Sequence, residues 1–174
     1  MDQLTEFRKH KDEFFRESHH SPIPHEARHT FAGLNYYAPN PDLVFKLNVE
    51  EADGSELSIG TTDGATRTYR RVGKVSFEVN GEQATLTLFD TGHPGWFLPF
   101  RDSTSGKETY GAGRYLDLEP NPDGTVTIDF NYAYNPSCVY DEAYSCPLPP
   151  PENWLQVPIE AGEQNFDPGE PGSH

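Results

Sequence analysis

Hydrophobic residues near the start of the chain recur at helical spacing: Leu4, Phe7, Phe14 and Phe15. Charged residues occupy the other face, namely Glu6, Arg8, Lys9, Asp12, Glu13 and Arg16. This pattern is typical of an amphipathic helix, and we expect it to end before His19-His20-Ser21-Pro22. A second, short helix is predicted to follow, with Pro24 near its start and Gly33 past its end.

From Leu43 onward the hydrophobic period changes to two, which is typical of half-buried strands. Turn signals separate the segments, and Asn80-Gly81 is the strongest hairpin signal among them. The predicted strands are 43–49, 56–61, 66–72, 75–79, 84–88, 97–100, 114–118 and 125–130. Short strands at regular spacing favour an antiparallel β-sandwich or a partly open barrel, with the helices covering one end or face.

The length of 174 residues fits a single domain over 1–174. Aromatic residues make up 13% of the chain and can fill a core although the hydrophobic fraction is only 34%. The Pro147-Leu148-Pro149-Pro150-Pro151 run must be extended, because proline fixes φ and donates no hydrogen bond. Residues 164–174 have little to bury, and we expect a loose tail.

A formal net charge of −15 is the strongest signal in the composition. Such a field repels nucleic acid and anionic membrane surfaces, so neither is expected as a partner. An acid-rich, lysine-poor chain suits a halophilic source, where concentrated salt screens self-repulsion; an ordinary acidic protein is the alternative. The start MDQLTEF resembles no signal peptide and no run is long enough to span a bilayer, so a cytoplasmic protein is expected.

Candidate chemistry begins in the glycine-containing segment that starts at Phe97. It gathers Arg101, Asp102, Lys107, Tyr110 and Arg114 among Gly106, Gly111 and Gly113. Cations are scarce elsewhere, and arginine binds carboxylate or phosphate through a bidentate fork. The segment lacks a Walker or dinucleotide-binding spacing. The alternative is that its charges are solvated and its glycines serve turns.

A second candidate segment runs from Asp129 to Leu155 and contains Tyr134, Asn135, Cys138 and Cys146. Seven residues separate the two cysteines, unlike the spacing of common zinc or redox motifs. Two buried thiols are the first interpretation, a disulfide the second and two metal ligands the third. A cysteine nucleophile would need a base that the sequence does not place.

The string His25-Glu26-Ala27-Arg28-His29 is a literal HExxH match. In metalloproteases this motif puts two imidazoles on one helical face, with the glutamate polarising water. Here it follows two prolines on a short polar segment with no recognisable third ligand, so a chance match is favoured. No metal or other cofactor is expected. The candidate ligands, should a metal bind, are His25, His29, Cys138 and Cys146.

The strings FLPFRDSTSGKETYGAGRYLDL, DFNYAYNPSCVY, CPLPPPENWL and IEAGE resemble the bacterial and archaeal domain-of-unknown-function family 1684. SPIPHEARHTFAGLNYY and TYRRVG extend the resemblance to about residues 4–163. The resemblance implies no known activity, cofactor or catalytic residue, and it implies variation at positions 25 and 29. It implies a shared signature at Arg101, Asp102, Thr104, Gly106, Tyr110, Gly111, Gly113, Arg114, Tyr115, Asn131, Tyr134, Asn135, Pro136, Cys138, Cys146, Pro147 and Asn153.

The leading hypothesis is a domain that binds a small polar or anionic molecule. Arg101, Lys107 and Arg114 would neutralise the molecule, and Asp102, Tyr110, Tyr134 and Asn135 would complete the site. One alternative is a hydrolase that uses Asp102 or Cys138 with a bound metal. Another is that the block 97–163 is a structural clasp, with function residing in a protein partner. Polar groups that only satisfy one another would make the block a clasp.

Overall fold

The computed structural model describes residues 2–166 of the chain. Helix α1 spans Gln3–Glu17, and it is followed by two 3-10 helices, η1 at His25–Thr30 and η2 at Pro41–Leu43. The strands are β1 Val44–Asn48, β2 Glu50–Glu51, β3 Glu56–Gly60, β4 Thr66–Val79, β5 Glu82–Asp90, β6 Trp96–Phe100, β7 Arg114–Leu118 and β8 Thr125–Asp129. Three further 3-10 helices are η3 Phe130–Tyr132, η4 Ser137–Val139 and η5 Pro151–Asn153.

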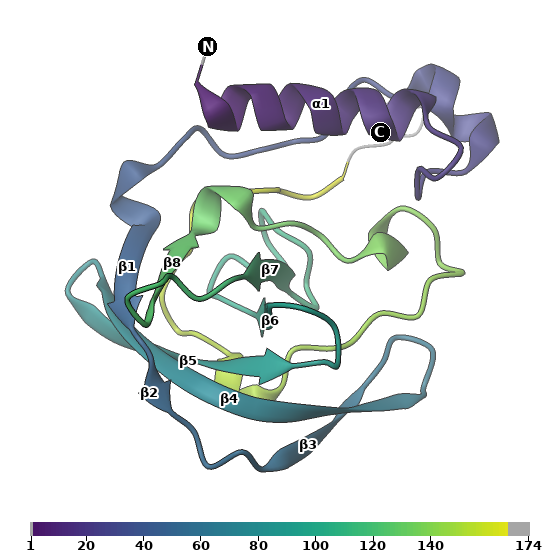
Figure 1. Ribbon diagram of the computed structural model, residues 1–174. Helices are drawn as coiled ribbons and strands as arrows, with labels where there is room; N and C mark the ends of the chain where they lie inside the picture. Colours follow the sequence, from purple (N-terminus) through teal and green to yellow (C-terminus); the bar gives the residue numbers. More distant parts are fainter. Residues whose placement is uncertain (1, 167–174) are drawn as a thin grey trace.

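The strands form two antiparallel sheets that face each other (Figure 1). The larger sheet has the order β2-β4-β5-β6-β7, with β3 also paired to β4. The smaller sheet pairs β1 with β8, with Val44 opposite Asp129. Within residues 2–166 the sheets do not close into a barrel. The prediction of a mainly β, sandwich-like domain with an N-terminal helix is therefore confirmed.

The long strand β4 corrects one detail of the prediction. The segments predicted as two strands, 66–72 and 75–79, form one strand with a bulge between Arg71 and Gly73. The predicted hairpin at Asn80-Gly81 is present, and both residues have the positive φ, 52° and 81°, that a type I′ turn requires. The change of the hydrophobic period from 3.6 to 2 residues thus located the strands. The bulge interrupts the alternation, and for that reason one strand was predicted as two.

The main core lies between the two sheets and is rich in aromatic and aliphatic side chains. Phe100, Phe130 and Ile128 are fully buried in it, with Leu86 and Leu98 of the larger sheet. A second, smaller cluster, Ile59, Tyr69 and Phe89, lies on a separate part of the larger sheet and packs against Phe97. The sheet therefore carries apolar side chains in two separate clusters.

Helix α1 packs against the domain through part of the predicted apolar face, Leu4 and Phe15, and through residues of the charged face. Phe7 and Phe14 are 41% and 44% exposed, whereas Phe15 is buried. Arg8 and Asp12 were predicted to lie on the opposite, charged face, yet both are partly buried and hydrogen-bonded to the domain. In Figure 1 the helix lies across the top of the molecule, above the C-terminal segment. Polar contacts orient this helix as much as apolar ones do.

The second predicted helix exists, but it is the 3-10 helix η1. A 3-10 helix has about three residues per turn, so positions 25 and 29 lie about 120° apart around it. An α-helix would place positions four apart on one face. This backbone does not provide the shared face that an HExxH metal site uses. No group of three His, Cys, Asp or Glu in the described chain is arranged to hold a metal ion.

The C-terminal segment 159–166 runs under α1 and is held by hydrogen bonds. Gln164 donates its N–H to the carbonyl of Asn35 at 2.8 Å, and Asn165 donates to Glu108 at 2.9 Å. Phe166 stacks on Phe31, with 6.3 Å between the ring centroids. The first three residues of the tail predicted to be loose are thus tied to the domain, and the remainder lies outside the described residues. No helix of residues 2–166 is both long and apolar enough to cross a membrane.

Candidate functional site

The cations predicted to grip an anion do not converge on one surface. Arg114 is completely buried, Arg101 is partly buried and Lys107 is exposed. The Arg101 guanidinium lies over the ring of Trp154, 4.7 Å from its centroid. Gly113, at φ +117°, has no room for a Cβ because the carbonyl oxygen of Phe100 occupies that place. The glycine therefore permits close packing of β7 on β6, and its own N–H bonds to the carbonyl of Tyr110 at 3.0 Å.

Arg114 holds the C-terminal segment in place. Its guanidinium donates to the carbonyl oxygens of Ile159 at 2.8 Å, Glu163 at 3.1 Å and Ala161. The Asp102 carboxylate lies 3.5 Å from it and also accepts the Ile159 N–H at 2.6 Å. Burial lowers the pKa of Arg114, and the charge of Asp102 opposes that shift. Both groups point into the protein, where they balance each other.

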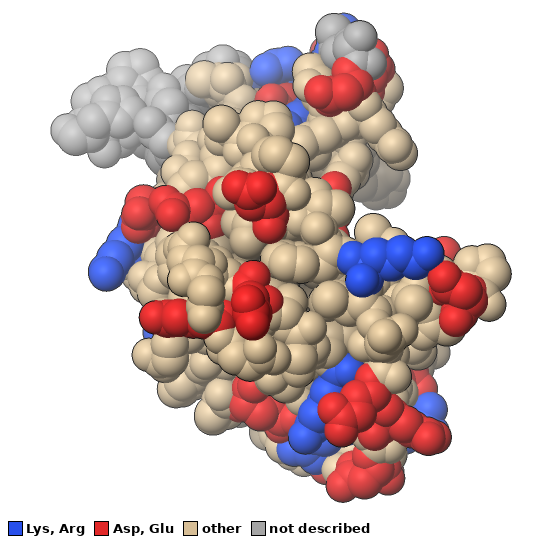
Figure 2. Space-filling view, turned by 90° about the vertical axis from the view of Figure 1, so that its left-hand side faces the viewer, with Lys and Arg blue, Asp and Glu red and all other residues tan. Residues whose placement is uncertain are grey.

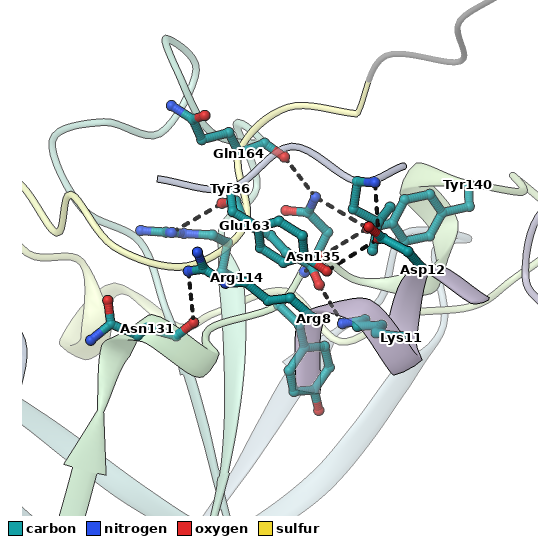
Figure 3. A network of polar contacts seen from close by, with 12 residues as sticks. Arg8, Lys11, Asp12, Tyr36, Arg114, Asn131, Asn135, Tyr140, Glu163 and Gln164 are labelled. Atoms are coloured by element: carbon teal, nitrogen blue, oxygen red, sulfur yellow. Dashed lines mark hydrogen bonds and ion pairs between the residues drawn. The ribbon is translucent and has the colours of Figure 1, made fainter. Parts of the chain in front are cut away.

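Glu163 continues this arrangement and is only 2% exposed. One carboxylate oxygen accepts the Asn135 N–H at 2.9 Å and the Tyr140 hydroxyl at 2.8 Å, and the other forms an ion pair with Lys11 of α1. Figure 3 shows Glu163 between Asn135 and Lys11. We call Asp102, Arg114, Asn135 and Glu163 the polar clasp. It joins β7, the loop after β8, the C-terminal segment and α1.

Two further asparagines of the block 97–163 form hydrogen bonds to backbone groups through their side-chain amides. The Asn153 amide accepts the Thr87 N–H at 2.8 Å and donates to the carbonyls of Thr87 and Pro99 at 2.9 and 2.8 Å. It bridges β5 and β6, which share one residue pair, Phe89 with Phe97. Asn131 likewise pairs with both backbone groups of Asn40. These side chains satisfy buried backbone groups, as a structural role requires.

A cleft of about 620 Å³ opens beside the second apolar cluster of the larger sheet. Strands β4, β6 and β7 contribute to its lining, together with the β5–β6 loop and the loop 134–147. In Figure 1 the latter loop, drawn in green, runs along the right-hand side of the molecule. The aromatic and charged residues that line the cleft, together with His93, are Arg67, Tyr69, His93, Trp96, Phe97, Tyr115, Asp117, Tyr134 and Tyr144.

Four rings of this lining form a continuous row across the elements. Tyr69 contacts Phe97 at 5.9 Å between centroids, Phe97 contacts Tyr115 at 4.8 Å, and Tyr115 contacts Tyr134 at 5.7 Å. All three contacts are edge-to-face, the geometry that aromatic quadrupoles favour. The row runs from β4 through β6 and β7 to the loop after β8.

Polar groups of the cleft have internal partners at some atoms and face solvent at others. The Tyr134 hydroxyl donates to Asp117 at 2.7 Å, and the Tyr115 hydroxyl donates to the carbonyl of Pro147. Burial raises the pKa of both tyrosines above the ordinary value of 10.0, so their hydroxyls remain hydrogen-bond donors in alkaline solution as well. Arg67 and His93 are exposed. Arg67 donates one N–H to the carbonyl of Ser145 at 2.7 Å.

The predicted site residues are therefore divided among different places. Asp102, Arg114 and Asn135 belong to the polar clasp, Tyr134 lines the cleft, and Tyr110 lies beside Cys138. Arg67, Tyr69, His93, Trp96 and Asp117 were missed. The sequence offered one signal for them: Arg67 and Tyr69, and likewise Tyr115 and Asp117, are two residues apart in a predicted strand. Residues at this spacing share a face of the strand.

The fold and this cleft define an antiparallel, two-sheet β domain with an aromatic-lined surface site. The chain belongs to the protein family of unknown function DUF1684, whose model matches residues 29–164. Comparison with curated proteins gives no match. The chain is similar to an uncharacterized protein from gene locus rrnAC0354 of Haloarcula marismortui, whose structure was solved by NMR in solution. The two chains are 41% identical, with a TM-score of 0.71 over 93% of this chain and 92% of the other.

Proposed function

We propose that the aromatic cleft binds a small organic molecule that carries a flat or apolar part and an anionic group. The continuous row of rings from Tyr69 to Tyr134 carries this proposal. A volume of about 620 Å³ suits such a ligand, since ligand pockets typically measure about 300–1,000 Å³. The rings supply apolar contact, while Arg67 supplies the charge.

Arg67 is the cation best placed for the anionic group. Its hydrogen bond to Ser145 uses one of five guanidinium N–H donors, and the side chain is exposed at the cleft. Arg114, one of the three cations predicted from the sequence, is buried and bonds to three backbone carbonyls. The proposal thus keeps an anionic ligand and replaces the predicted cations Arg101, Lys107 and Arg114 with Arg67.

The two tryptophans provide a direct test, because Trp96 lines the cleft and Trp154 does not. In Trp154→Phe, titration with phenyl phosphate or benzoate should change the fluorescence of Trp96 saturably. In Trp96→Phe, the signal of Trp154 should stay constant. Equal responses in both variants, or none in either, would contradict binding in the cleft.

Recognition of the anionic group is tested with a variant at Arg67 and a matched control variant at Arg70. Arg67→Gln should weaken phenyl phosphate binding about tenfold, the scale of one lost charge-assisted hydrogen bond. Arg70→Gln is the control, because Arg70 lies three residues along the same strand, is paired with Asp90, and does not line the cleft. A similar loss in both variants would show a general charge effect instead of a contact.

The hydrolase hypothesis has less support. Burial raises the pKa of Cys146, which disfavours the nucleophilic thiolate. The group beside the Cys138 sulfur is the Tyr110 hydroxyl at 3.8 Å, and burial raises the pKa of that hydroxyl to about 12. A base needs a pKa near the working pH, so this neighbour is poorly suited to activate the thiol.

The acidic composition supports the proposal of a halophilic protein that does not bind nucleic acid. Figure 2 shows Asp and Glu side chains at several places on one face, with Lys and Arg beside some of them. At a net charge of −15, self-repulsion destabilises the folded state until salt screens it. Thermal unfolding should therefore shift upward between low and molar KCl. Equal unfolding temperatures would contradict the halophilic assignment.

A further inference from the structure

We propose that Cys138 and Cys146 form a reversible redox site, in which a small-molecule disulfide converts the two thiols into an intramolecular disulfide. Cys146 is also among the lining residues of the cleft, but the proposal does not rest on ligand binding there. The two cysteines are the only ones in the chain, and both are free thiols. Their surroundings make one of them accessible to a reagent and position the other to complete the bond.

The two cysteines meet although seven residues separate them. The backbone N–H of Cys138 donates to the sulfur of Cys146 at 3.3 Å. Interaction with the Cys138 thiol also contributes to the raised pKa of Cys146, although burial is the larger cause. A disulfide requires such proximity, because the Cα atoms of bonded cysteines lie about 4.4–6.8 Å apart.

Both cysteines are held by well-bonded segments. Cys138 lies in η4, where the N–H of Val139 bonds to the carbonyl of Pro136 at 3.0 Å. Cys146 pairs with Thr62 of the β3–β4 turn: its N–H reaches the Thr62 hydroxyl at 3.1 Å and its carbonyl accepts the Thr62 N–H at 2.9 Å. The residues between them, 142–144, are exposed. This intervening segment has room to adjust while the sulfurs close to bonding distance.

Exposure assigns the order of the two steps. Cys138 is partly exposed and Cys146 is buried, so a soluble disulfide reaches Cys138 first. The Cys138 thiolate attacks one sulfur of the reagent RSSR, its S–S bond breaks, and one RS⁻ leaves and takes up the proton that Cys138 lost. The Cys146 thiolate then attacks the Cys138 sulfur, and the second RS⁻ leaves and takes up its proton. Two protein thiols are oxidised by two electrons, and RSSR is reduced to two RSH.

The amide of Cys138 assists the second step. Its N–H already points at the sulfur of Cys146, and this hydrogen bond lowers the pKa of the thiol, which offsets part of the rise that burial causes. The same contact keeps the attacking sulfur next to the residue that it must attack. In a reducing compartment the product would be transient, which is typical of redox-responsive cysteine pairs.

The test incubates the full chain with oxidised glutathione and measures the mass of the intact protein. The expected product is about 2 Da lighter than the reduced chain, takes up no N-ethylmaleimide after unfolding, and returns to two reactive thiols with dithiothreitol. Cys138→Ser, a change at the partly exposed position, should keep the fold and should form no internal disulfide. Cys146→Ser should keep the accessible thiol and accumulate the mixed disulfide with glutathione at Cys138.

Three results for the native chain would overturn the proposal. They are stable retention of one glutathione per molecule, formation of disulfide-linked dimers, and persistence of two free thiols under conditions that oxidise a model dithiol. The circular dichroism of each variant checks that the fold is intact. If Cys146→Ser unfolds, the native chain still decides the outcome, because an internal disulfide requires both the loss of about 2 Da and the loss of both N-ethylmaleimide-reactive thiols in the monomer.

Discussion

The polar clasp and the aromatic cleft use neighbouring residues of the same strands in opposite ways. On β7, Arg114 is buried and binds three carbonyls, whereas Tyr115 lines the cleft. After β8, Asn135 belongs to the clasp and bonds to Glu163, while Tyr134 ends the row of rings. Adjacent residues of a strand point to opposite faces, so one short sequence serves both regions.

The difference between the two regions separates structural from functional chemistry. In the clasp, charged groups face inward and have protein partners, so they fix the C-terminal segment and α1. In the cleft, rings and an arginine face a volume large enough for a ligand. Arg114 and Asp102, two of the binding residues predicted from the sequence, bond instead to the backbone of the C-terminal segment. Variants in the two regions should therefore separate loss of stability from loss of binding.

The largest expected effect is on the clasp. Arg114→Met should lower the free energy of unfolding by about 3–5 kcal/mol, because Asp102 then stays buried without its partner charge. Urea denaturation measures this loss. Arg101→Met is the matched control and should cost less than about 1 kcal/mol, the scale of an exposed cation–π contact. Adding Asp102→Asn to Arg114→Met should recover part of the loss; no recovery would argue against charge burial as its cause.

The next effect concerns the contact between the clasp and α1. Glu163→Gln should cost about 2 kcal/mol, because a neutral amide binds the Lys11 ammonium less well than the carboxylate does. Glu160→Gln, a change at an exposed position of the same segment, should stay within about 0.5 kcal/mol of the native chain. Equal losses by urea denaturation would mean that the segment is not held through Glu163.

The cleft should respond in binding and not in stability. Tyr144 is 40% exposed, so Tyr144→Ala should change the unfolding free energy by no more than about 0.5 kcal/mol. The lost ring contact should weaken phenyl phosphate binding by about five- to tenfold. Fluorescence titration in a Trp154→Phe background measures this loss. A large destabilisation would place Tyr144 in the structural part of the protein and remove the contrast between the two regions.

The smallest effect is a dependence of stability on pH near the clasp. Asp12 accepts the Leu34 N–H at 3.1 Å, and burial raises the pKa of its carboxyl above the ordinary 3.8. The folded state then retains this proton to a higher pH than the unfolded state does. Its contribution is therefore present below the unfolded pKa and is lost as the pH rises through the folded pKa.

Asp12→Asn removes that dependence. The stability of the variant relative to the native chain should improve between about pH 3 and pH 7, by less than about 1 kcal/mol because the group is partly exposed. Urea denaturation at the two pH values gives the difference. A constant difference would show that burial does not disfavour the charged form of Asp12.

Much of the fold was predictable because it depends on local pattern. The period of two located the strands, and Asn80-Gly81 set a hairpin through its positive φ angles. The helix α1 was located as well, with Asp2 capping it by accepting the Thr5 N–H at 2.8 Å. These features depend on neighbours a few residues apart, which the sequence alone specifies.

The sequence by itself thus determined the class of fold, the acidic character and the block 97–163, which holds the polar clasp and part of the cleft lining. Only the tertiary structure decided which face of α1 is buried, whether Arg114 faces a ligand or a carbonyl, and which rings meet in the cleft. Arg114 binds carbonyls 45–49 residues away, and the cleft combines three strands with two loops. Such contacts depend on how the sheets and segments pack, and no local period along the chain encodes that arrangement.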